Sequence, residues 1–412
     1  MRHAPGPPAS AFAPLRLPGF RMLWLVWLGA NLTMWMNDVA SAWLMTSLTG
    51  NAFMIALVQS ASTLPLFLLG LPSGALADLL DRRRYLAWTH AWVAGVALAL
   101  AALTFFGALN APLLLLCSFL NGIGMAMRWP LFAAIVPQLV RRDDLPAALA
   151  LNGIAGNMAR IIGPLIAGAL LAGAGSACVY LLNALLSCAA LALILRWRPA
   201  PEASAPPPER FVAAMRAGLW HVLGRAQLRN ILLRIFLFFL QATALMALLP
   251  LVALRLAGGG AGAGAFTTLL VAMGAGAVLA AFNLHRLRRL AGPDTLVGVG
   301  VCVHAAASAV AVLAPGMGLA AAALAVAGMA WIATANALTV AMQLALPDRV
   351  RARAMAIYQM AVMGGSAAGA ALWGYVASVG SVRASVLAAA VLGPLVWWST
   401  RRLGVGAAHG QA

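Results

Sequence analysis

Apolar stretches, each about 20 residues long, recur along the whole chain and are separated by short polar segments. A helix of that length crosses the roughly 30 Å hydrocarbon core of a lipid bilayer. Of the 412 residues, 63% are hydrophobic and 9% are charged, whereas about 25% are charged in a typical soluble protein. The pattern predicts an all-α membrane protein with twelve transmembrane helices, at residues 20–47, 52–77, 85–109, 111–137, 146–173, 177–196, 229–255, 262–285, 293–314, 317–345, 354–379 and 382–400.

The arginines predict how these helices are oriented. All 27 basic residues are arginine, and with the N-terminus in the cytoplasm the outer loops contain only Arg255 and Arg383. Because arginine is enriched in cytoplasmic loops, we expect a multi-pass protein of the inner membrane, embedded in the lipid bilayer, with both termini in the cytoplasm. The net charge of +18 therefore reflects topology, and we expect no nucleic-acid partner.

A polar, proline-rich segment divides the twelve predicted helices into six and six. Segments of this composition connect domains as solvated linkers. After it, apolar residues recur at helical spacing, which predicts either an amphipathic helix on the inner membrane face or a continuation of the linker. We expect a cytoplasmic tail, a six-helix bundle, a cytoplasmic linker, a second six-helix bundle and a second cytoplasmic tail, at residues 1–19, 20–195, 196–225, 226–402 and 403–412.

The two halves of the sequence align when one is shifted by half of the 412-residue length. The shift superposes Gly163 on Gly369 and Gly168 on Gly374, and it aligns pairs of arginines that follow helices 52–77 and 262–285. A shared offset of this kind indicates an internal duplication. Two parallel six-helix repeats joined by a cytoplasmic linker are an architecture of secondary transporters.

The segment after the second predicted helix resembles a signature of the major facilitator superfamily, G-x-L-A-D-x-x-G-R-(R/K). The matching residues are Gly74, Leu76, Ala77, Asp78, Arg82 and Arg83. Leu79 stands where a basic residue is usual, and Asp81 stands where glycine is usual. The three consecutive arginines after an aspartate look like the superfamily's branch of drug and siderophore exporters, of the transmembrane secretion effector type that includes the enterobactin exporter.

Two further segments resemble motifs of the same superfamily. The run "GNMARIIGPLIAG" is similar to the antiporter motif G-P-x-x-G-G, with Gly163, Pro164 and Gly168 in register. Small residues let helices approach closely and proline bends a helix, and the alternative is ordinary packing in a glycine-rich protein. The run "SFLNGIGMA" resembles the motif R-x-x-Q-G-x-G, but Ser118 occupies the place of the arginine that the superfamily links to proton transfer.

The resemblance implies two pseudo-symmetric six-helix bundles that rock about a site near the midplane, with a small-molecule substrate and protons as the coupling ion. It also implies a conformational gate made of Gly74, Asp78, Arg82 and Arg83. In that gate Asp78 engages the N-terminus of the helix predicted at 354–379, where an anion meets free backbone N–H groups. The contact is expected to hold the outward-open state and to break as the carrier turns inward.

Asp38 is the one residue of nine acidic residues that lies well inside a predicted span. A carboxylate in the membrane faces a cavity, pairs with a base or stays protonated, and proton coupling needs a group that alternates between such states. Arg160 is a candidate partner, because Asp38 and Arg160 lie about 27 Å and about 22 Å from the inner ends of their helices. The alternatives are a permanent ion pair with Arg160 and a position of Asp38 nearer the outer interface.

Arg128 is a second basic candidate for proton coupling. By the same helical rise it lies about 13 Å from the inner end of its helix. It is either a functional replacement for the missing motif arginine or a residue whose long side chain extends to the inner interface.

Other polar side chains within the spans are candidates for a substrate cavity. They are Asn31, Trp35, Gln241, Asn336, Tyr358 and Gln359. Asn31 and Trp35 share a helix face with Asp38, and each candidate is alternatively a satisfied hydrogen bond between helices. Together with Met34, Met246 and Trp331 they would suit a bulky amphipathic compound, whereas His304 is expected at the periphery.

The sequence predicts a secondary active transporter that exports a drug-like or siderophore-like small molecule by alternating access, coupled to protons and acting as a monomer. The alternatives are an uptake symporter or facilitator of the same fold and, in another class, a non-transporting membrane scaffold or receptor. The sequence contains no Walker-type phosphate loop, catalytic triad or cysteine and histidine at ligand spacing. We therefore expect no enzymatic activity, no cofactor and no metal site.

Overall fold

The computed structural model describes residues 12–197, 220, 223–258, 262–290 and 292–404. In these ranges twelve long α-helices follow one another, with two short 3-10 helices, η1 (Ala13–Arg16) and η2 (Arg142–Asp144). The long helices are α1 (Pro18–Leu48), α2 (Ala52–Leu79), α3 (Arg82–Phe105), α4 (Ala111–Leu139), α5 (Leu145–Gly173), α6 (Ser176–Arg196), α8 (Ala226–Ala257), α9 (Gly262–Leu290), α10 (Pro293–Leu313), α11 (Met317–Leu344), α12 (Asp348–Val379) and α13 (Val382–Thr400). The twelve predicted helices are confirmed, and the structure extends several of them by a turn or more.

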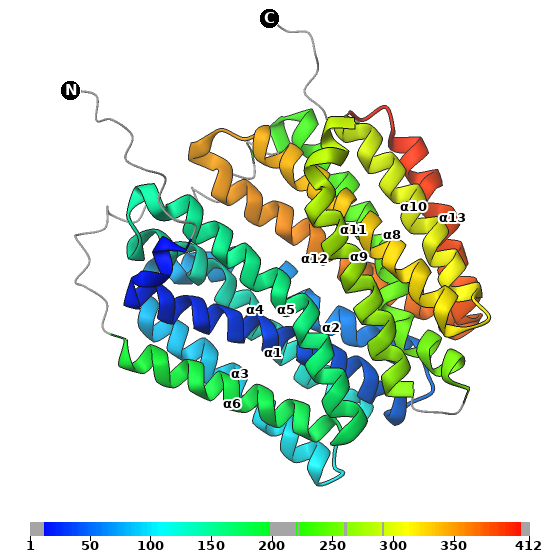
Figure 1. The fold of residues 1–412 in the computed structure, drawn as a ribbon, viewed down its shortest axis with the longest axis horizontal. Helices are drawn as coiled ribbons and strands as arrows, with labels where there is room; N and C mark the ends of the chain where they lie inside the picture. The colour runs from blue at the N-terminus through cyan, green and yellow to red at the C-terminus, as the bar shows by residue number, and fades with distance from the viewer. Residues whose placement is uncertain (1–11, 198–219, 221–222, 259–261, 291, 405–412) are drawn as a thin grey trace, which may run out of the picture.

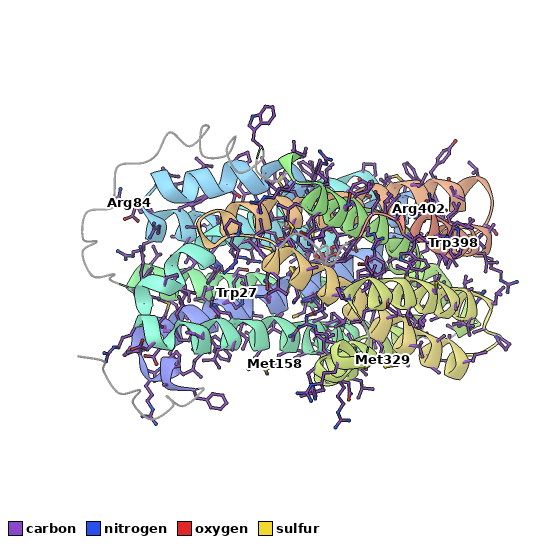
Figure 2. All side chains as sticks on the ribbon, turned by 90° about the horizontal axis from the view of Figure 1, so that it is seen from above. Trp27, Arg84, Met158, Met329, Trp398 and Arg402 are labelled. Atoms are coloured by element: carbon purple, nitrogen blue, oxygen red, sulfur yellow. The ribbon has the colours of Figure 1, made fainter. Side chains whose placement is uncertain are left out.

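Eleven of these helices are long and apolar enough to cross a membrane. The twelfth, α1, is 31 residues long and includes Asn31, Asn37 and Asp38, which lower its hydropathy. Large apolar side chains are exposed on the surface, among them Trp398 at 57% and Met158 at 40% (Figure 2). The chain is a multi-pass membrane protein, and such exposed apolar side chains suit contact with lipid.

Cap residues mark where the helices begin and end. The side chains of Asn51, Asn110 and Ser381 accept hydrogen bonds from backbone N–H groups in the first turns of α2, α4 and α13. These bonds satisfy donors that a helix start leaves free. At the end of α8, Gly258 has a φ of 57°, a left-handed conformation that glycine adopts without a steric penalty. The predicted amphipathic helix in the linker lies outside the described residues.

Helices α1–α6 gather in one half of the molecule and α8–α13 in the other (Figure 1). The packing repeats between the halves: α1 contacts α5 as α8 contacts α12, α2 contacts α4 as α9 contacts α11, and α3 contacts α6 as α10 contacts α13. The all-α fold of two pseudo-symmetric six-helix bundles is therefore confirmed.

Glycines that align at the half-length offset occupy equivalent contacts. A Cβ at Gly163 would lie 2.7 Å from Cβ of Trp35, so glycine is needed where α5 crosses α1. Its mate Gly369 lies in the same way against the backbone of Leu240, where α12 crosses α8. The motif glycine Gly163 and its neighbour Pro164 thus belong to a close helix crossing inside the N-terminal bundle.

The second aligned pair lies between the halves. A Cβ at Gly168 would overlap the side chain of Thr267, where α5 meets α9. A Cβ at Gly374 would lie 2.5 Å from Cβ of Ala56, where α12 meets α2. These two contacts are related by the duplication, and both bring backbone of one half close to the other half.

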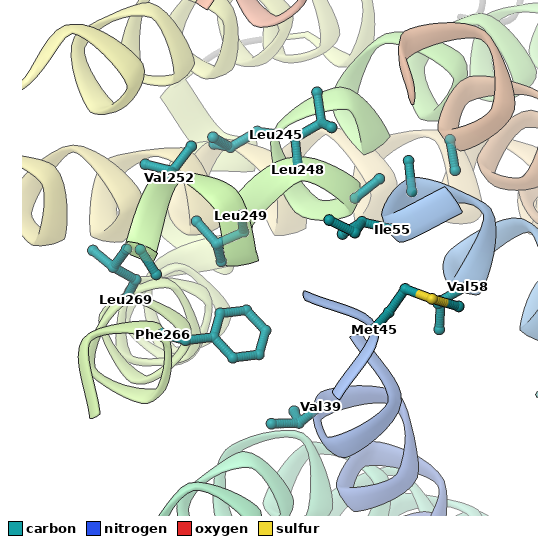
Figure 3. Packing of buried hydrophobic residues seen from close by; sticks show 14 of the residues in the cluster. Val39, Met45, Ile55, Val58, Leu245, Leu248, Leu249, Val252, Phe266 and Leu269 are labelled. Atoms are coloured by element: carbon teal, nitrogen blue, oxygen red, sulfur yellow. The ribbon is translucent and has the colours of Figure 1, made fainter. Parts of the chain in front are cut away.

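Three hydrophobic clusters show where the halves join. We call the end of the molecule where α1 begins and α13 ends the terminal end, and the opposite end the far end. The far-end cluster draws on both halves and includes Met45, Ile55, Leu249, Phe266 and Leu269 (Figure 3). The two terminal-end clusters each draw on a single half in the described ranges. The halves are therefore sealed together at the far end and have separate cores at the terminal end.

Candidate functional site

Asp38 lies on α1 where the two halves meet. It lines a small cavity together with Ile55, Gln59 and Ser62 from α2 and Met246 from α8. Asp38 stands ten residues before the end of α1, about 15 Å along the axis, which is half of a hydrocarbon core of roughly 30 Å. Within the described ranges Asp38 makes no hydrogen bond or ion pair, so its carboxylate is available to a ligand or a proton.

Arg160 does not pair with Asp38 in the part of the chain that the structure describes. Its guanidinium lies over the ring of Trp35, with Cζ 5.4 Å from the ring centroid, a distance at which a cation and an aromatic face attract each other. The Nε atom of Arg160 is buried without a hydrogen-bond partner. Trp35 lies one turn before Asp38 on α1, and the guanidinium of Arg160 is held at this ring and not at the carboxylate.

The expectation that Arg128 extends to the inner interface is wrong. Its side chain is 3% exposed, and Nη2 donates to the carbonyl oxygen of Ala30 at 3.1 Å, while Nη1 has no partner. His90 on α3 is close enough to interact with it electrostatically. Arg128 is buried because its face of α4 points toward α3. Gly124, one turn earlier on the same face, packs against Val93 of α3. Arg128 is a buried cation inside the N-terminal bundle.

Two predicted substrate-cavity residues have hydrogen-bond partners within the protein. The side chain of Asn31 is buried, and its Nδ2 donates to the carbonyl oxygen of Trp27 in the same helix at 2.8 Å. The Oδ1 of Asn336 on α11 accepts a hydrogen bond from Arg288 on α9. The side chain of Asn336 is therefore already hydrogen-bonded to another helix, which was the alternative to a role in the substrate cavity.

Tyr358 and Gln359 are neighbours on α12 with different environments. Tyr358 is buried, and its hydroxyl lies 2.9 Å from Oγ1 of Thr339 on α11. Gln359 is half-buried, and its side chain makes no hydrogen bond with a described residue. Of this pair, Gln359 is the one whose polar group is free for a ligand.

The placement of Gln241 and His304 corrects two expectations. Gln241 lies against Gly393 of α13, so it faces the interior of the C-terminal bundle and not the junction of the halves. His304 is 5% exposed, with its ring 5.7 Å from that of Trp331, and is not peripheral. Helical spacing shows which residues share a face, but it does not show which neighbour that face meets.

Gln59 and Ser62 were missed by sequence reasoning. Both line the cavity of Asp38. Ser62 donates to the backbone oxygen of Gln59 at 3.1 Å, whereas the amide of Gln59 makes no side-chain hydrogen bond with a described residue. The signal was present in the run "QSAST", a cluster of polar residues inside an apolar span, where polar groups face the protein interior.

The gate segment is built partly of structural contacts. Asp81 caps α3 by accepting from the backbone N–H of Arg84, and Arg83 donates from Nε to the carbonyl oxygen of Ile194 at 3.1 Å, at the end of α6. A cation at the carbonyl end of a helix is favourable. The nearest atom to a Cβ at Gly74 belongs to Pro130 of the same half. The side chain of Asp78 is outside the described residues, so its contact with α12 stays a prediction.

Asp38 and Gln59 therefore lie together at the junction of α1, α2 and α8, and one turn earlier on α1 the ring of Trp35 contacts the guanidinium of Arg160. The groups offer an unpaired anion, an unpaired cation, a free amide and an aromatic face. Such a set has the chemistry to bind a polar molecule and to hold a proton.

Comparison with protein families gives a match along nearly the whole chain. The model of a family described as transmembrane secretion effector matches residues 9–401. A staphyloferrin A transporter of Staphylococcus aureus is 31% identical over 139 residues, which are 34% of this chain and 35% of that protein. The aligned part thus spans about a third of this relative.

Solved structures with the same fold are transporters. The nucleoside transporter NupG has a TM-score of 0.76 at 14% identity, over 93% of this chain and 99% of its own. A bacterial homolog of the human lysosomal transporter Spinster, in an inward-facing and occupied conformation, has a TM-score of 0.75 at 16% identity, over 95% and 98%. At these identities the likeness establishes the fold alone.

Proposed function

Because the chain belongs to the transmembrane secretion effector family of major facilitator transporters, we propose that it exports a siderophore-like or drug-like small molecule by proton-coupled alternating access. The chain is a transporter of small molecules and not an enzyme. The observation that carries the proposal is the unpaired carboxylate of Asp38 in a cavity between the two halves. An ionisable group at that place responds both to protons and to the movement of one half against the other.

The separate cores at the terminal end support an inward-open assignment. With the orientation that the arginines predict, the terminal end faces the cytoplasm and the sealed far end faces the outside. Export then requires the far-end contacts between α5 and α9 and between α2 and α12 to open, while the terminal ends close. Because each half is a bundle of one chain, a monomer contains both halves that the movement needs, and we propose it as the working unit.

The direction of transport is tested with membrane vesicles of both orientations. We expect inside-out vesicles, acidified inside, to accumulate staphyloferrin A or ethidium, and right-side-out vesicles to accumulate neither. Accumulation in right-side-out vesicles alone would show an uptake carrier instead. If neither vesicle type shows accumulation or counterflow for a panel of siderophores and cationic dyes, the chain acts as a scaffold or receptor and the proposal is wrong.

Arg160 is proposed to bind an acidic group of the substrate. Its guanidinium has no anionic partner among the described residues and rests against the ring of Trp35, one turn before Asp38 on α1. Arg160→Gln is expected to raise the Kd of an acidic substrate by about 10- to 150-fold, the effect of losing a charged hydrogen bond of about 1.5–3 kcal/mol. Isothermal titration with purified protein measures it, and Arg141→Gln, in an exposed loop, is the control. An unchanged Kd for acidic substrates would exclude this role.

The gate is proposed to work through Asp78. In the outward-open state its carboxylate would meet the N-terminus of α12, a contact that contributes up to about 2 kcal/mol. Asp78→Asn is therefore expected to slow turnover by about 2- to 30-fold and to leave substrate affinity unchanged. Initial rates of counterflow and a parallel binding titration separate the two effects, with Asp143→Asn as a loop carboxylate control. Wild-type turnover in Asp78→Asn would refute the gate.

A further inference from the structure

The two halves meet along two seams, and the seam between α2 and α12 is closed over most of its length. Near its middle, Ser60 of α2 donates to the carbonyl oxygen of Ala367 of α12 at 2.7 Å. Further toward the terminal end, a Cβ at Gly70 of α2 would lie 3.3 Å from the side chain of Met360 of α12. From the far-end contact at Ala56 to the contact at Gly70 the seam extends about 21 Å along α2.

The seam between α5 and α9 is closed only toward the far end. Beyond the contact of Gly168 with Thr267, a Cβ at Gly274 of α9 would lie 3.8 Å from the side chain of Ile161 of α5. Gly168 and Ile161 are about 10 Å apart along α5. The closed part of this seam is therefore about half as long as that of the other.

The faces of α5 and α9 that form this seam are exposed toward the terminal end. Continued at helical spacing, the face of α5 reaches Asn157 and Ala150, and the face of α9 reaches Ala281 and His285. All four residues are exposed. Asn157 lies about 18 Å from the terminal end of α5, and Gly70 lies about 14 Å from that of α2. The halves are thus apart between α5 and α9 at a level where α2 and α12 are still in contact.

The open side is flanked by apolar side chains on the outer surface. Leu165 is 42% exposed beside the closed part of the seam, so this flank of α5 lies on the surface of the molecule, and Met158 continues it at 40%. On α9, Leu279 and Phe282 are 55% and 76% exposed. Exposed apolar side chains of this kind suit contact with lipid, so the open side is directed toward the bilayer.

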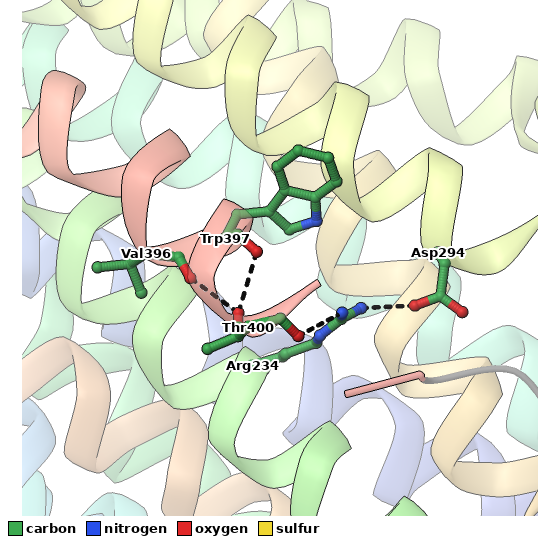
Figure 4. A network of polar contacts seen from close by, with 5 residues as sticks. All are labelled: Arg234, Asp294, Val396, Trp397 and Thr400. Atoms are coloured by element: carbon green, nitrogen blue, oxygen red, sulfur yellow. Dashed lines mark hydrogen bonds and ion pairs between the residues drawn. The ribbon is translucent and has the colours of Figure 1, made fainter. Parts of the chain in front are cut away.

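Hydrogen bonds hold each half together at the terminal end. Nε1 of Trp24 and Nε1 of Trp27 on α1 donate to backbone carbonyl oxygens of α5 at 3.0 Å and 3.2 Å. In the other half, Arg234 of α8 donates to Oδ1 of Asp294 on α10 at 2.6 Å and to the carbonyl oxygen of Thr400 on α13 at 2.9 Å (Figure 4). The opening therefore lies between two internally bonded bundles and not within either of them.

We propose that an amphipathic substrate enters from the inner leaflet of the bilayer, between the terminal parts of α5 and α9, while the α2–α12 seam stays closed as a hinge. The leaflet follows from the orientation that the arginines predict. Asn157 offers a polar group beside the apolar flanks, and polar residues within membrane spans mark substrate pathways. Arg160, about one turn further along α5, would then meet an acidic group of the substrate. The inference rests on the proposed transport function, but the opening itself is measured without transport.

Distances on the two sides test the hinge. In a background without the four cysteines, spin labels on Asn157 and Ala281 span the open side, and labels on Leu68 and Ala368 span the α2–α12 seam; all four positions are exposed. Electron paramagnetic resonance is expected to show the first distance changing with pH or substrate and the second staying fixed. Equal changes on the two sides would show a symmetric opening and would overturn the proposal.

Collision rates of the label on Asn157 show what the open side faces. Molecular oxygen concentrates in the bilayer, whereas nickel ethylenediaminediacetate stays in water. We expect this label to collide with oxygen about as often as a label on Leu165, the surface control on the same helix. A label that collides only with the nickel complex would show an opening to the cytoplasm alone, and one that collides with neither would show a closed seam; both results would overturn the proposal.

Matched tryptophan variants test the path in proteoliposomes loaded with Hoechst 33342, an amphipathic dye that partitions into the membrane. Asn157→Trp places a bulky side chain between α5 and α9 and is expected to slow the initial rate by about fivefold or more. Leu165→Trp adds the same bulk on the outer flank and is expected to leave the rate unchanged. Equal rates in the two variants would contradict entry at this place. Absence of dye transport by the wild-type protein would count against the proposed export of drug-like compounds instead, and the distances and collision rates would still decide the side of entry.

Discussion

Replacing Asp38 by asparagine is expected to reduce proton-driven transport to background while substrate exchange without a gradient continues. Asparagine preserves the shape of the side chain and its hydrogen bonding, but it cannot release or take up a proton. Asp38 lines the cavity at the junction of α1, α2 and α8 and has no partner among the described residues. Its loss therefore removes the coupling and not a structural ion pair. Proteoliposomes with an imposed pH gradient measure the driven rate, and counterflow measures the exchange.

Two further variants sharpen this test. Asp38→Glu retains a carboxylic acid and is expected to restore part of the driven transport, whereas Asp143→Asn removes an exposed loop carboxylate and is expected to leave it unchanged. If the Asp38→Asn variant still accumulates substrate against the substrate's concentration gradient when only a proton gradient is imposed, another group carries the proton. Arg128 with His90, the buried pair inside the N-terminal bundle, would then be the next groups to examine.

Replacing Gly168 by leucine is expected to open the far end and to stop turnover. A side chain at Gly168 overlaps Thr267 where α5 meets α9, so it disfavours the sealed state but has space when the halves part there. Overpacking of this kind costs about 1–3 kcal/mol, which shifts the ratio of sealed to open molecules by about 5- to 150-fold. Counterflow rates should fall by the same factor as the ratio of sealed to open molecules. Labelling of far-end cysteines by a reagent added from the outside should rise.

The same helix provides the control for this variant. A Cβ at Gly153 meets no atom within 4 Å, so Gly153→Leu should transport at the wild-type rate. Gly374→Leu, at the duplicated contact with Ala56 of α2, should reproduce the effect of Gly168→Leu. Unchanged far-end accessibility in both interface variants would mean that these glycines pack the helices without setting the conformational equilibrium.

The sequence was sufficient for the fold because the fold follows from one-dimensional patterns. Runs of apolar residues located the helices, and the half-length offset identified Gly163 with Gly369 and Gly168 with Gly374 as equivalent contacts. The offset also relates Gly122, packed on Ser62, to Gly328, packed on Met273, although sequence reasoning did not single out that pair. A duplication fixes contacts because each half must bury its helices in the same way.

The site was harder to predict, because it depends on which neighbour each helix face meets. Depth along a helix placed Asp38 and Arg160 at similar levels, but it could not show that Trp35 receives the guanidinium. Gln241 has the depth expected of a cavity residue, yet it faces α13. Gln59 belongs to the polar run "QSAST" inside an apolar span, but the run alone does not show that its side chain lies at the junction of the halves.

Distances across the two ends test the rocking of the halves most directly. In a background without the four cysteines, spin labels on Phe106 and Leu313 report the far end, and labels on Arg141 and Leu344 report the terminal end; all four are exposed. Electron–electron double resonance is expected to show the far-end distance lengthening and the terminal-end distance shortening under the same change of pH or substrate. Two distances that change in the same direction, or stay fixed while the protein transports, would contradict alternating access by these halves.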